Sequence, residues 1–82
     1  MPRYFFHLRD GDALLADHEG EELRDLEAVR GYAVESAREL LSLAVLSGSA
    51  GSLNQQIEVL DEGGRTVLTV AVGHATGTET QT

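Results

Sequence analysis

The sequence of 82 residues contains no cysteine and no lysine, and none of its apolar stretches is long. The absence of cysteine excludes disulfides, thiolate zinc sites, iron–sulfur clusters and cysteine nucleophiles. No apolar run approaches the roughly 20 residues that a membrane-spanning helix needs, and the start of the chain lacks the apolar core of a signal peptide. We therefore expect a cytoplasmic protein that does not contact a membrane.

Basic side chains are scarce, since six arginines stand against 14 acidic residues and the formal net charge is −8. A chain with this charge repels a phosphate backbone, so nucleic acid is not an expected partner. Residues 10–27 alone have a formal charge of −7, with one arginine among eight acids. The acids are Asp10, Asp12, Asp17, Glu19, Glu21, Glu22, Asp25 and Glu27. This segment is either a solvated loop leading into an acidic helix start, or a docking surface for a basic partner, or a cation site.

The N-terminal part of the chain predicts a β-hairpin. Residues 3–9 (RYFFHLR) are rich in aromatic residues, which favours a strand. Asp10-Gly11 suits a two-residue turn, and residues 12–17 (DALLAD) would form the return strand. The opposed pairs are then Arg9 with Asp12, Leu8 with Ala13, His7 with Leu14, Phe6 with Leu15, and Phe5 with Ala16.

Side-chain alternation divides this predicted hairpin into two faces that are both partly apolar. One face carries Tyr4, Phe6, Leu8, Ala13 and Leu15. The other carries Phe5, His7, Arg9, Asp12, Leu14 and Ala16.

The middle of the chain predicts a loop over residues 18–24 and then one helix that ends near Leu46. Asp25 is a suitable N-cap, and Gly48 is a suitable residue just beyond the helix. Apolar residues at steps of three and four form one stripe: Leu26, Val29, Ala33, Ala37, Leu40 and Ala44. Residues 40–46 (LLSLAVL) are apolar nearly all round, so this end of the helix is either buried or covered by another molecule.

The C-terminal part predicts a second hairpin, with strands over residues 55–60 and 66–72 and a turn centred on Gly63-Gly64. The opposed pairs are Glu62 with Arg65, Leu60 with Val67, Val59 with Leu68, Glu58 with Thr69, and Ile57 with Val70. Residues 73–82 are small and polar, which predicts a flexible C-terminal tail.

The predicted fold class is α+β, a four-stranded antiparallel sheet built from two hairpins with one amphipathic helix on one face. A single domain over residues 1–72 is expected. Its core would contain Tyr4, Phe6, Leu8, Leu15, Ile57, Val59, Leu68 and Val70 from the sheet, beneath Leu26, Val29, Ala33, Ala37 and Leu40 from the helix. The uncovered sheet face would carry Phe5, His7, Leu14, Leu60 and Val67, which is too apolar for a solvated surface and predicts a homodimer or a ligand.

The first 11 residues (MPRYFFHLRDG) resemble the start of a family of short bacterial proteins of unknown function. Members of that family continue through an acidic Asp-x-Glu-Gly loop, which residues 17–20 (DHEG) match. Their helix start and closing hairpin are matched by residues 25–28 (DLEA) and 57–65 (IEVLDEGGR). The resemblance covers residues 1–72 and implies a free-standing domain, but it carries no activity because the family is uncharacterised.

His7 is the residue that offers the most chemistry. Imidazole can act as a general base or a metal ligand near neutral pH, or it can be a half-buried structural residue. The candidate binding residues on its face of the hairpin are Phe5, His7, Arg9, Asp12 and Leu14. The candidate acidic surface for a partner consists of Asp17, Glu19, Glu21 and Glu22.

Recognisable catalytic and metal-binding motifs are missing from the sequence. It lacks a phosphate loop, a dinucleotide fingerprint, a nucleophile elbow and a His-Glu-x-x-His motif. Asp10-Gly11-Asp12 is followed by Ala13 and Leu14 where a calcium loop needs oxygen ligands. We therefore expect no enzyme, no catalytic residue, no metal and no cofactor. The favoured interpretation is a homodimeric protein-binding or regulatory module, with a small-molecule or divalent-metal site near His7 as the alternative.

Overall fold

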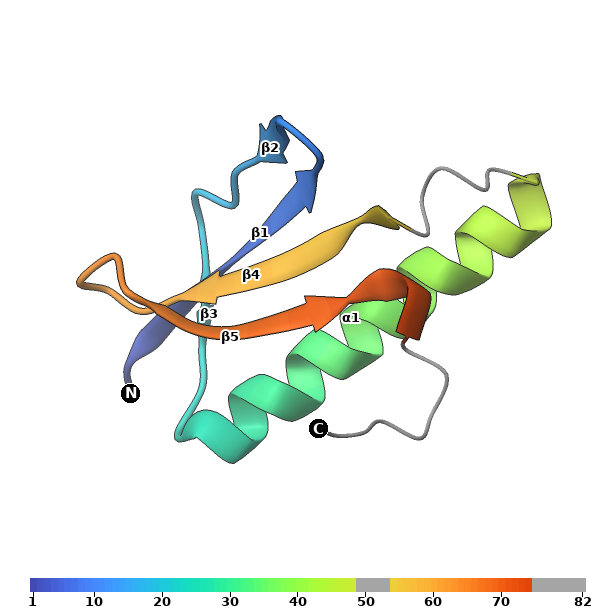
Figure 1. Cartoon of the computed structure of the whole chain (residues 1–82). Helices are drawn as coiled ribbons and strands as arrows, with labels where there is room; N and C mark the ends of the chain where they lie inside the picture. The colour runs from blue at the N-terminus through green and yellow to red at the C-terminus, as the bar shows by residue number, and fades with distance from the viewer. Residues whose placement is uncertain (49–53, 75–82) are drawn as a thin grey trace.

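The computed structural model consists of two layers, an antiparallel sheet and one helix that lies across one of its faces (Figure 1). The structure describes residues 1–48 and 54–74. Its elements are β1 (Arg3–Asp10), β2 (Ala13–Leu15), β3 (Glu21–Glu22), α1 (Leu26–Ser47), β4 (Gln56–Leu60), β5 (Thr66–Ala71) and the 3-10 helix η2 (Val72–His74). The predicted α+β class is confirmed.

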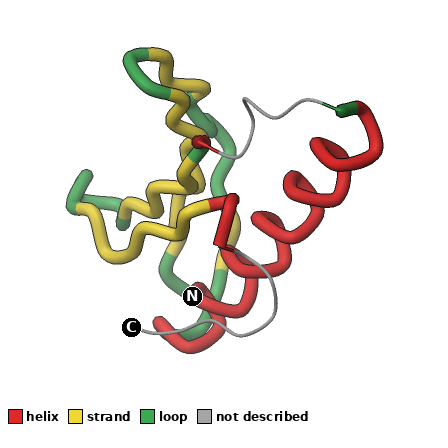
Figure 2. The backbone as a smooth tube through the Cα atoms, turned by 45° about the vertical axis from the view of Figure 1, so that its right-hand side comes forward, coloured by secondary structure: helices red, strands yellow, loops and turns green. Residues whose placement is uncertain are grey.

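The strand order is β2-β1-β4-β5, so the two hairpins meet through β1 and β4. These two strands are antiparallel, with Phe6 opposite Val59 and Leu8 opposite Ile57. The short strand β3 pairs with the beginning of β1, a pairing that the sequence analysis missed by assigning its residues to a loop. In Figure 2 the strands lie on one side of the molecule and α1 on the other.

The predicted register of the first hairpin is wrong by two residues. The turn residues are Gly11 and Asp12, and the observed pairs are Leu8 with Leu15, Arg9 with Leu14, and Asp10 with Ala13. Gly11 has a φ of 62° whereas Asp12 does not have a positive φ, which fits a type II′ turn with glycine in its first position. Because the shift is two residues, each side chain keeps its predicted face. The return strand is also shorter than predicted, since β2 ends at Leu15.

The second hairpin follows the predicted register except next to its turn. The pairs of Ile57 with Val70, Glu58 with Thr69 and Val59 with Leu68 are confirmed. A bulge after Val59 places Leu60 opposite Thr66 instead of Val67, and Val67 packs against the core. The Asp61 side chain explains the longer turn, because its Oδ1 accepts hydrogen bonds from the backbone N–H groups of Gly63 (2.9 Å) and Arg65 (3.0 Å).

The helix α1 begins and ends as predicted. Asp25 Oδ1 accepts a hydrogen bond from the Ala28 N–H at 2.8 Å, which caps the first turn. Gly48 has a φ of 72°, the left-handed conformation that is common just after a helix. The predicted flexible tail begins at residue 73. However, Gly73 and His74 belong to η2, and residues 75–82 lie outside the described residues.

The core lies between α1 and the strands β4 and β5. Small helix residues allow this close approach, and the buried apolar residues are Tyr4, Val29, Ala33, Ala37, Ala44, Ile57, Val59 and Val72. Two predicted core residues are exposed instead: Leu15 by 71% and Leu26 by 57%. Leu15 is exposed because β2 lies at the edge of the sheet opposite to β5, away from the helix. Leu26 is the first helical residue, and the buried stripe of the helix begins at Val29.

Candidate functional site

The loop after β2 is attached to the edge of β1 through the side chain of Asp17. Asp17 Oδ2 accepts a hydrogen bond from the Phe6 N–H at 3.1 Å. Asp17 Oδ1 accepts two more, from the N–H groups of Glu19 (3.2 Å) and Gly20 (3.1 Å). On this edge β1 pairs with β3 at its start and with β2 at its end, so the carboxylate satisfies a backbone group in the gap between them.

His7 takes part in the same attachment. Its Nδ1 accepts a hydrogen bond from the backbone N–H of Asp17 at 2.9 Å. An accepting Nδ1 places the proton of the neutral ring on Nε2. His7 therefore contacts the backbone of Asp17, while the carboxylate of Asp17 is engaged by other backbone groups.

Gly20 completes the loop, and only glycine fits its position. Its φ is 73°, a conformation that other residues rarely adopt. An added Cβ would lie 2.8 Å from the Tyr4 carbonyl oxygen and 2.9 Å from Phe5 Cε2. Nearby, the Arg3 guanidinium donates hydrogen bonds to the Glu19 carbonyl (2.7 Å) and to Glu22 Oε2 (3.2 Å). The Asp-x-Glu-Gly motif thus has a structural role in holding the loop against β1.

Two opposing effects act on the pKa of Asp17. Burial alone would raise the pKa of its carboxyl group, but the hydrogen bonds from the Phe6, Gly20 and Glu19 N–H groups outweigh burial, and the neighbouring His7 adds to them. The pKa therefore lies below its ordinary value. The carboxylate is ionised at neutral pH, with its oxygens occupied by backbone donors.

The predicted binding residues gather on the sheet face opposite to α1, with one exception. Phe5, His7 and Arg9 alternate along β1, and Leu14 lies opposite Arg9 and is 45% exposed. Asp12 is apart from them, in the turn. Arg9 Nε donates a hydrogen bond to Glu58 Oε2 at 2.7 Å, so its charge is neutralised within the sheet.

The predicted acidic surface divides into outward and inward members. Glu19, Glu21 and Glu22 are exposed, on the loop and on β3. Glu22 forms an ion pair with Arg3, whereas Asp17 is partly buried and engaged by the backbone. In the described part of the chain, no group of three or more histidine, aspartate or glutamate side chains is placed to hold a metal ion.

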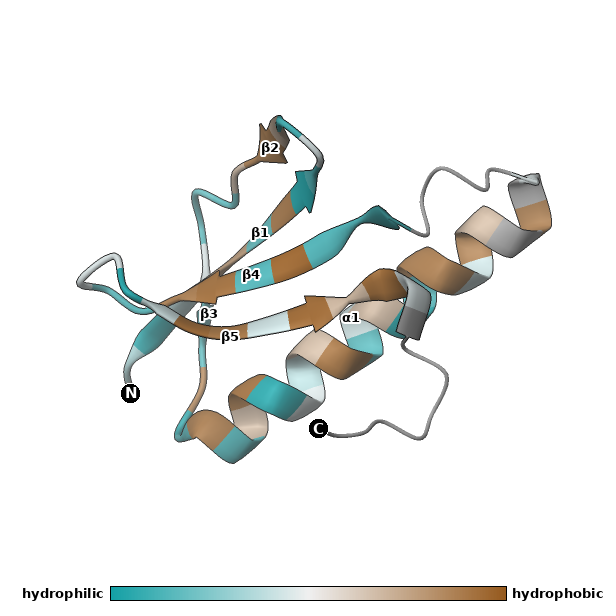
Figure 3. Ribbon diagram, viewed as in Figure 1, coloured by the Kyte–Doolittle hydropathy of each residue, from teal (hydrophilic) through white to brown (hydrophobic). Residues whose placement is uncertain are grey.

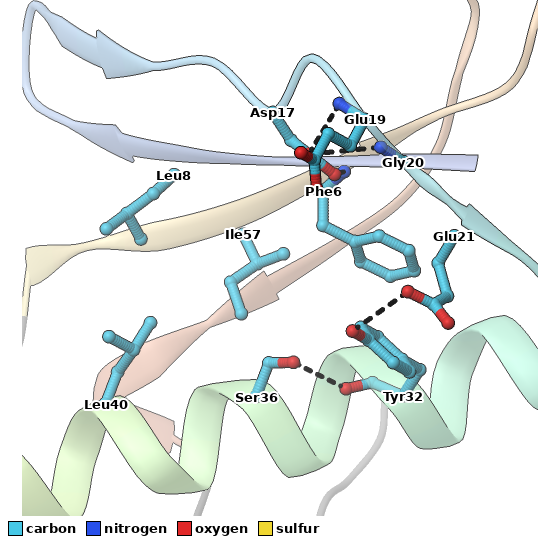
Figure 4. Close-up of a pocket in the computed structure, with 10 residues that line it drawn as sticks. All are labelled: Phe6, Leu8, Asp17, Glu19, Gly20, Glu21, Tyr32, Ser36, Leu40 and Ile57. Carbon is cyan, nitrogen blue, oxygen red and sulfur yellow. Dashed lines mark hydrogen bonds between the residues drawn. The ribbon is translucent and has the colours of Figure 1, made fainter.

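A pocket of about 300 Å³ opens between β1 and α1 (Figure 4). It forms because α1 packs mainly against β4, β5 and η2, which leaves a space beneath β1. The lining residues are Phe6, Leu8, Asp17, Glu19, Gly20, Glu21, Tyr32, Ser36, Leu40 and Ile57. The sequence analysis missed Tyr32 and Ser36, although their spacing of four residues places them on one helix face beside the buried stripe.

The polar end of this pocket combines two aromatic rings with a carboxylate. The ring centroids of Phe6 and Tyr32 are 4.7 Å apart, with an interplanar angle of 45°. The Tyr32 hydroxyl donates a hydrogen bond to Glu21 Oε1 at 3.4 Å, and Ser36 Oγ donates one to the Tyr32 carbonyl at 2.9 Å. Burial raises the pKa of the Tyr32 hydroxyl, and the nearby Glu21 carboxylate raises it further, so this group remains a hydrogen-bond donor.

Fold and geometry together define a small two-layer α+β domain whose histidine and aspartate hold a loop in place. The chain belongs to the family described as a domain of unknown function, DUF6894, which matches residues 3–73. The resemblance that its opening residues and loop indicated is therefore confirmed. A comparison with curated proteins and one with solved structures found no match. In the part of the chain that the structure describes, no helix is long and apolar enough to cross a membrane.

Proposed function

We propose that this protein is a non-enzymatic interaction module that acts as a homodimer and presents its acidic segment, residues 10–27, to a basic protein partner. The main observation in support of a dimer is the exposure of large apolar side chains at the end of α1. Leu43 is 61% exposed and Leu46 is 81% exposed. Side chains of this size on adjacent helical turns favour a partner molecule over water.

The distribution of charge supports a second copy of the chain as the molecule that covers this end. The helix carries no charged residue from Leu40 onward, and neither does the edge strand β5. Figure 3 shows the contrast along α1, where hydrophilic positions alternate in the first half and hydrophobic ones predominate in the second. Two molecules that each have a formal charge of −8 repel each other least where their uncharged surfaces meet.

The length of the helix also separates this end from the acids at the helix start. Among the acids at the helix start, Glu27 is the nearest to this end; it precedes Leu40 by 13 residues, about 20 Å along the helix, which is more than twice the screening length of about 8 Å at physiological ionic strength. Asp25 and Glu27 of one copy are then screened from a contact made by residues 40–46. Within residues 10–27, the acids that remain exposed are Asp10, Asp12, Glu19, Glu21, Glu22, Asp25 and Glu27. Such a concentration of one sign steers the approach of a basic protein.

The engagement of His7 and Asp17 supports a function without catalysis. A general base needs a free ring nitrogen or carboxylate oxygen within reach of a substrate proton. His7 Nδ1 and both Asp17 oxygens accept hydrogen bonds from the backbone instead. The same contacts weigh against a metal ion or small molecule held by Nδ1 of His7.

Light scattering on a size-exclusion column tests the dimer. We expect a dimer for the natural sequence at both low and high salt, and a monomer for Leu43→Glu. Leu14→Glu is the matched control, because it introduces the same charge at an exposed leucine on the sheet face opposite to α1. Circular dichroism confirms that each variant is folded. A monomer for the natural sequence, or a dimer broken by Leu14→Glu and kept by Leu43→Glu, would contradict the proposal.

A further inference from the structure

We propose that the pocket between β1 and α1 binds an arginine side chain of the basic partner. This inference rests on the proposed function, because it names the chemistry by which that partner is recognised. The pocket has an apolar end and an anionic, aromatic end (Figure 4). An arginine side chain has the same order of groups, a chain of methylenes that ends in a planar cation.

The apolar end is formed by side chains from both layers. Leu8 and Ile57 from the sheet and Leu40 from α1 point toward one another across the pocket (Figure 4). Leu8 and Leu40 are only partly buried, so apolar surface is available there. The methylene groups of a long side chain would remove this surface from water.

The anionic end offers a carboxylate whose charge is not neutralised. Among the described residues, Glu21 takes part in no ion pair, whereas its neighbour Glu22 is paired with Arg3. The Glu21 carboxylate accepts one hydrogen bond from the Tyr32 hydroxyl and has further acceptor capacity. Glu19 lines the same end and adds negative charge.

The rings of Phe6 and Tyr32 favour arginine over other cations. A guanidinium group stacks on aromatic rings and donates two parallel hydrogen bonds to one carboxylate, which an ammonium group does not do. A divalent metal ion is disfavoured because the described residues supply no group of three suitable ligands. The volume of about 300 Å³ is at the lower limit for ligand pockets and suits one side chain better than a cofactor.

Titration followed by amide signals in NMR spectra tests this inference. The probe is the peptide acetyl-Gly-Ser-Arg-Ser-Gly-amide, and the matched peptide carries citrulline, which has the shape of arginine without its charge. We expect the arginine peptide to shift the Gly20 and Ser36 signals and to leave Thr69, on β5, unchanged. The citrulline peptide should bind roughly tenfold more weakly or worse, the loss expected for a charge-assisted hydrogen bond. Equal binding of both peptides, or no shift at Gly20 and Ser36, would overturn the inference.

Two variants with the same change of charge distinguish binding in the pocket from nonspecific attraction of the peptide to an acidic surface. Glu21→Gln should weaken binding of the arginine peptide by roughly fivefold to tenfold, because the guanidinium loses one charged hydrogen-bond partner. Glu22→Gln, outside the pocket lining and paired with Arg3, should leave binding unchanged. If both variants weaken binding of the arginine peptide equally, the proposal that the pocket is its binding site is wrong. The oligomeric state of the same samples reports on the dimer separately, since neither variant changes residues 40–46.

Discussion

Replacing Asp17 by alanine tests whether the attachment of the loop to β1 supports the fold. Asp17→Ala removes the acceptor for three backbone N–H groups, of which those of Phe6 and Gly20 are partly buried and that of Glu19 is exposed. Water replaces the lost partner fully only at the exposed group. The other two then contribute about 1 kcal/mol or more each, so the free energy of unfolding should fall by about 2–3 kcal/mol.

That loss is large for a chain of this size. A domain of 82 residues has a free energy of unfolding of about 4–12 kcal/mol, and 1 kcal/mol shifts its melting temperature by about 4–8 °C. The Asp17→Ala protein should melt about 10–20 °C lower than the natural sequence. Urea and thermal unfolding followed by circular dichroism measure both quantities, at one fixed protein concentration because dimerisation would add to stability. Asp12→Ala, at an exposed turn residue, is the control and should change stability by less than about 0.5 kcal/mol.

The pH dependence gives the sharper form of this prediction. The pKa of Asp17 is lowered in the folded protein, so its stabilising effect is complete above the unfolded value of 3.8 and is lost as the pH falls through the folded pKa. The difference in stability between the natural protein and Asp17→Ala should therefore be largest at neutral pH and shrink below about pH 4. A difference under about 0.5 kcal/mol at pH 7, or one that stays constant down to pH 3, would refute the reasoning.

Replacing Gly20 or Gly31 by alanine should change the free energy of unfolding, measured in urea, in opposite directions. Gly20→Ala places a side chain on a left-handed backbone and makes it overlap the Tyr4 carbonyl. We therefore expect the free energy of unfolding to fall by about 3 kcal/mol. A fall of less than about 1 kcal/mol would contradict the observed loop geometry. Gly31→Ala adds a methyl group to an exposed helical position with nothing within 4 Å, so we expect a gain of about 1 kcal/mol. Destabilisation by Gly31→Ala would mean that another molecule or segment covers this position.

Side-chain alternation was sufficient to predict the faces of the sheet, but not every register. Asp10-Gly11 and Gly11-Asp12 both supply a glycine for a tight turn, in the second position of a type I′ turn or the first of a type II′ turn. The two choices differ by two residues in pairing and leave the faces unchanged, so the hydrophobic pattern cannot distinguish them. The bulge at Leu60 depends on hydrogen bonds of the Asp61 side chain, which also lie outside such a pattern.

The pocket and the attachment of Asp17 could not be predicted because both depend on how distant segments meet. Its neighbours in the sequence predict an acidic surface position for Asp17. Its contact with the Phe6 N–H requires the chain to turn back along β1, and β3, which directs this turn, has only two residues. Tyr32 and Ser36 line a pocket because α1 lies beneath β4 and β5 rather than under the middle of the sheet.

The pairing of β1 with β4 also has a consequence during synthesis of the chain. Phe5 pairs with Leu60, 55 positions later, so at about 5–20 residues per second β1 waits roughly 3–11 s for its central partner. Throughout that interval a strand rich in aromatic residues has no neighbour on one edge, a condition that promotes aggregation. The segment that emerges next contains most of the acids of residues 10–27, and like charge on unfinished chains opposes their association. The charge of the acidic segment therefore acts on the unfinished chain, before β4 has joined the sheet.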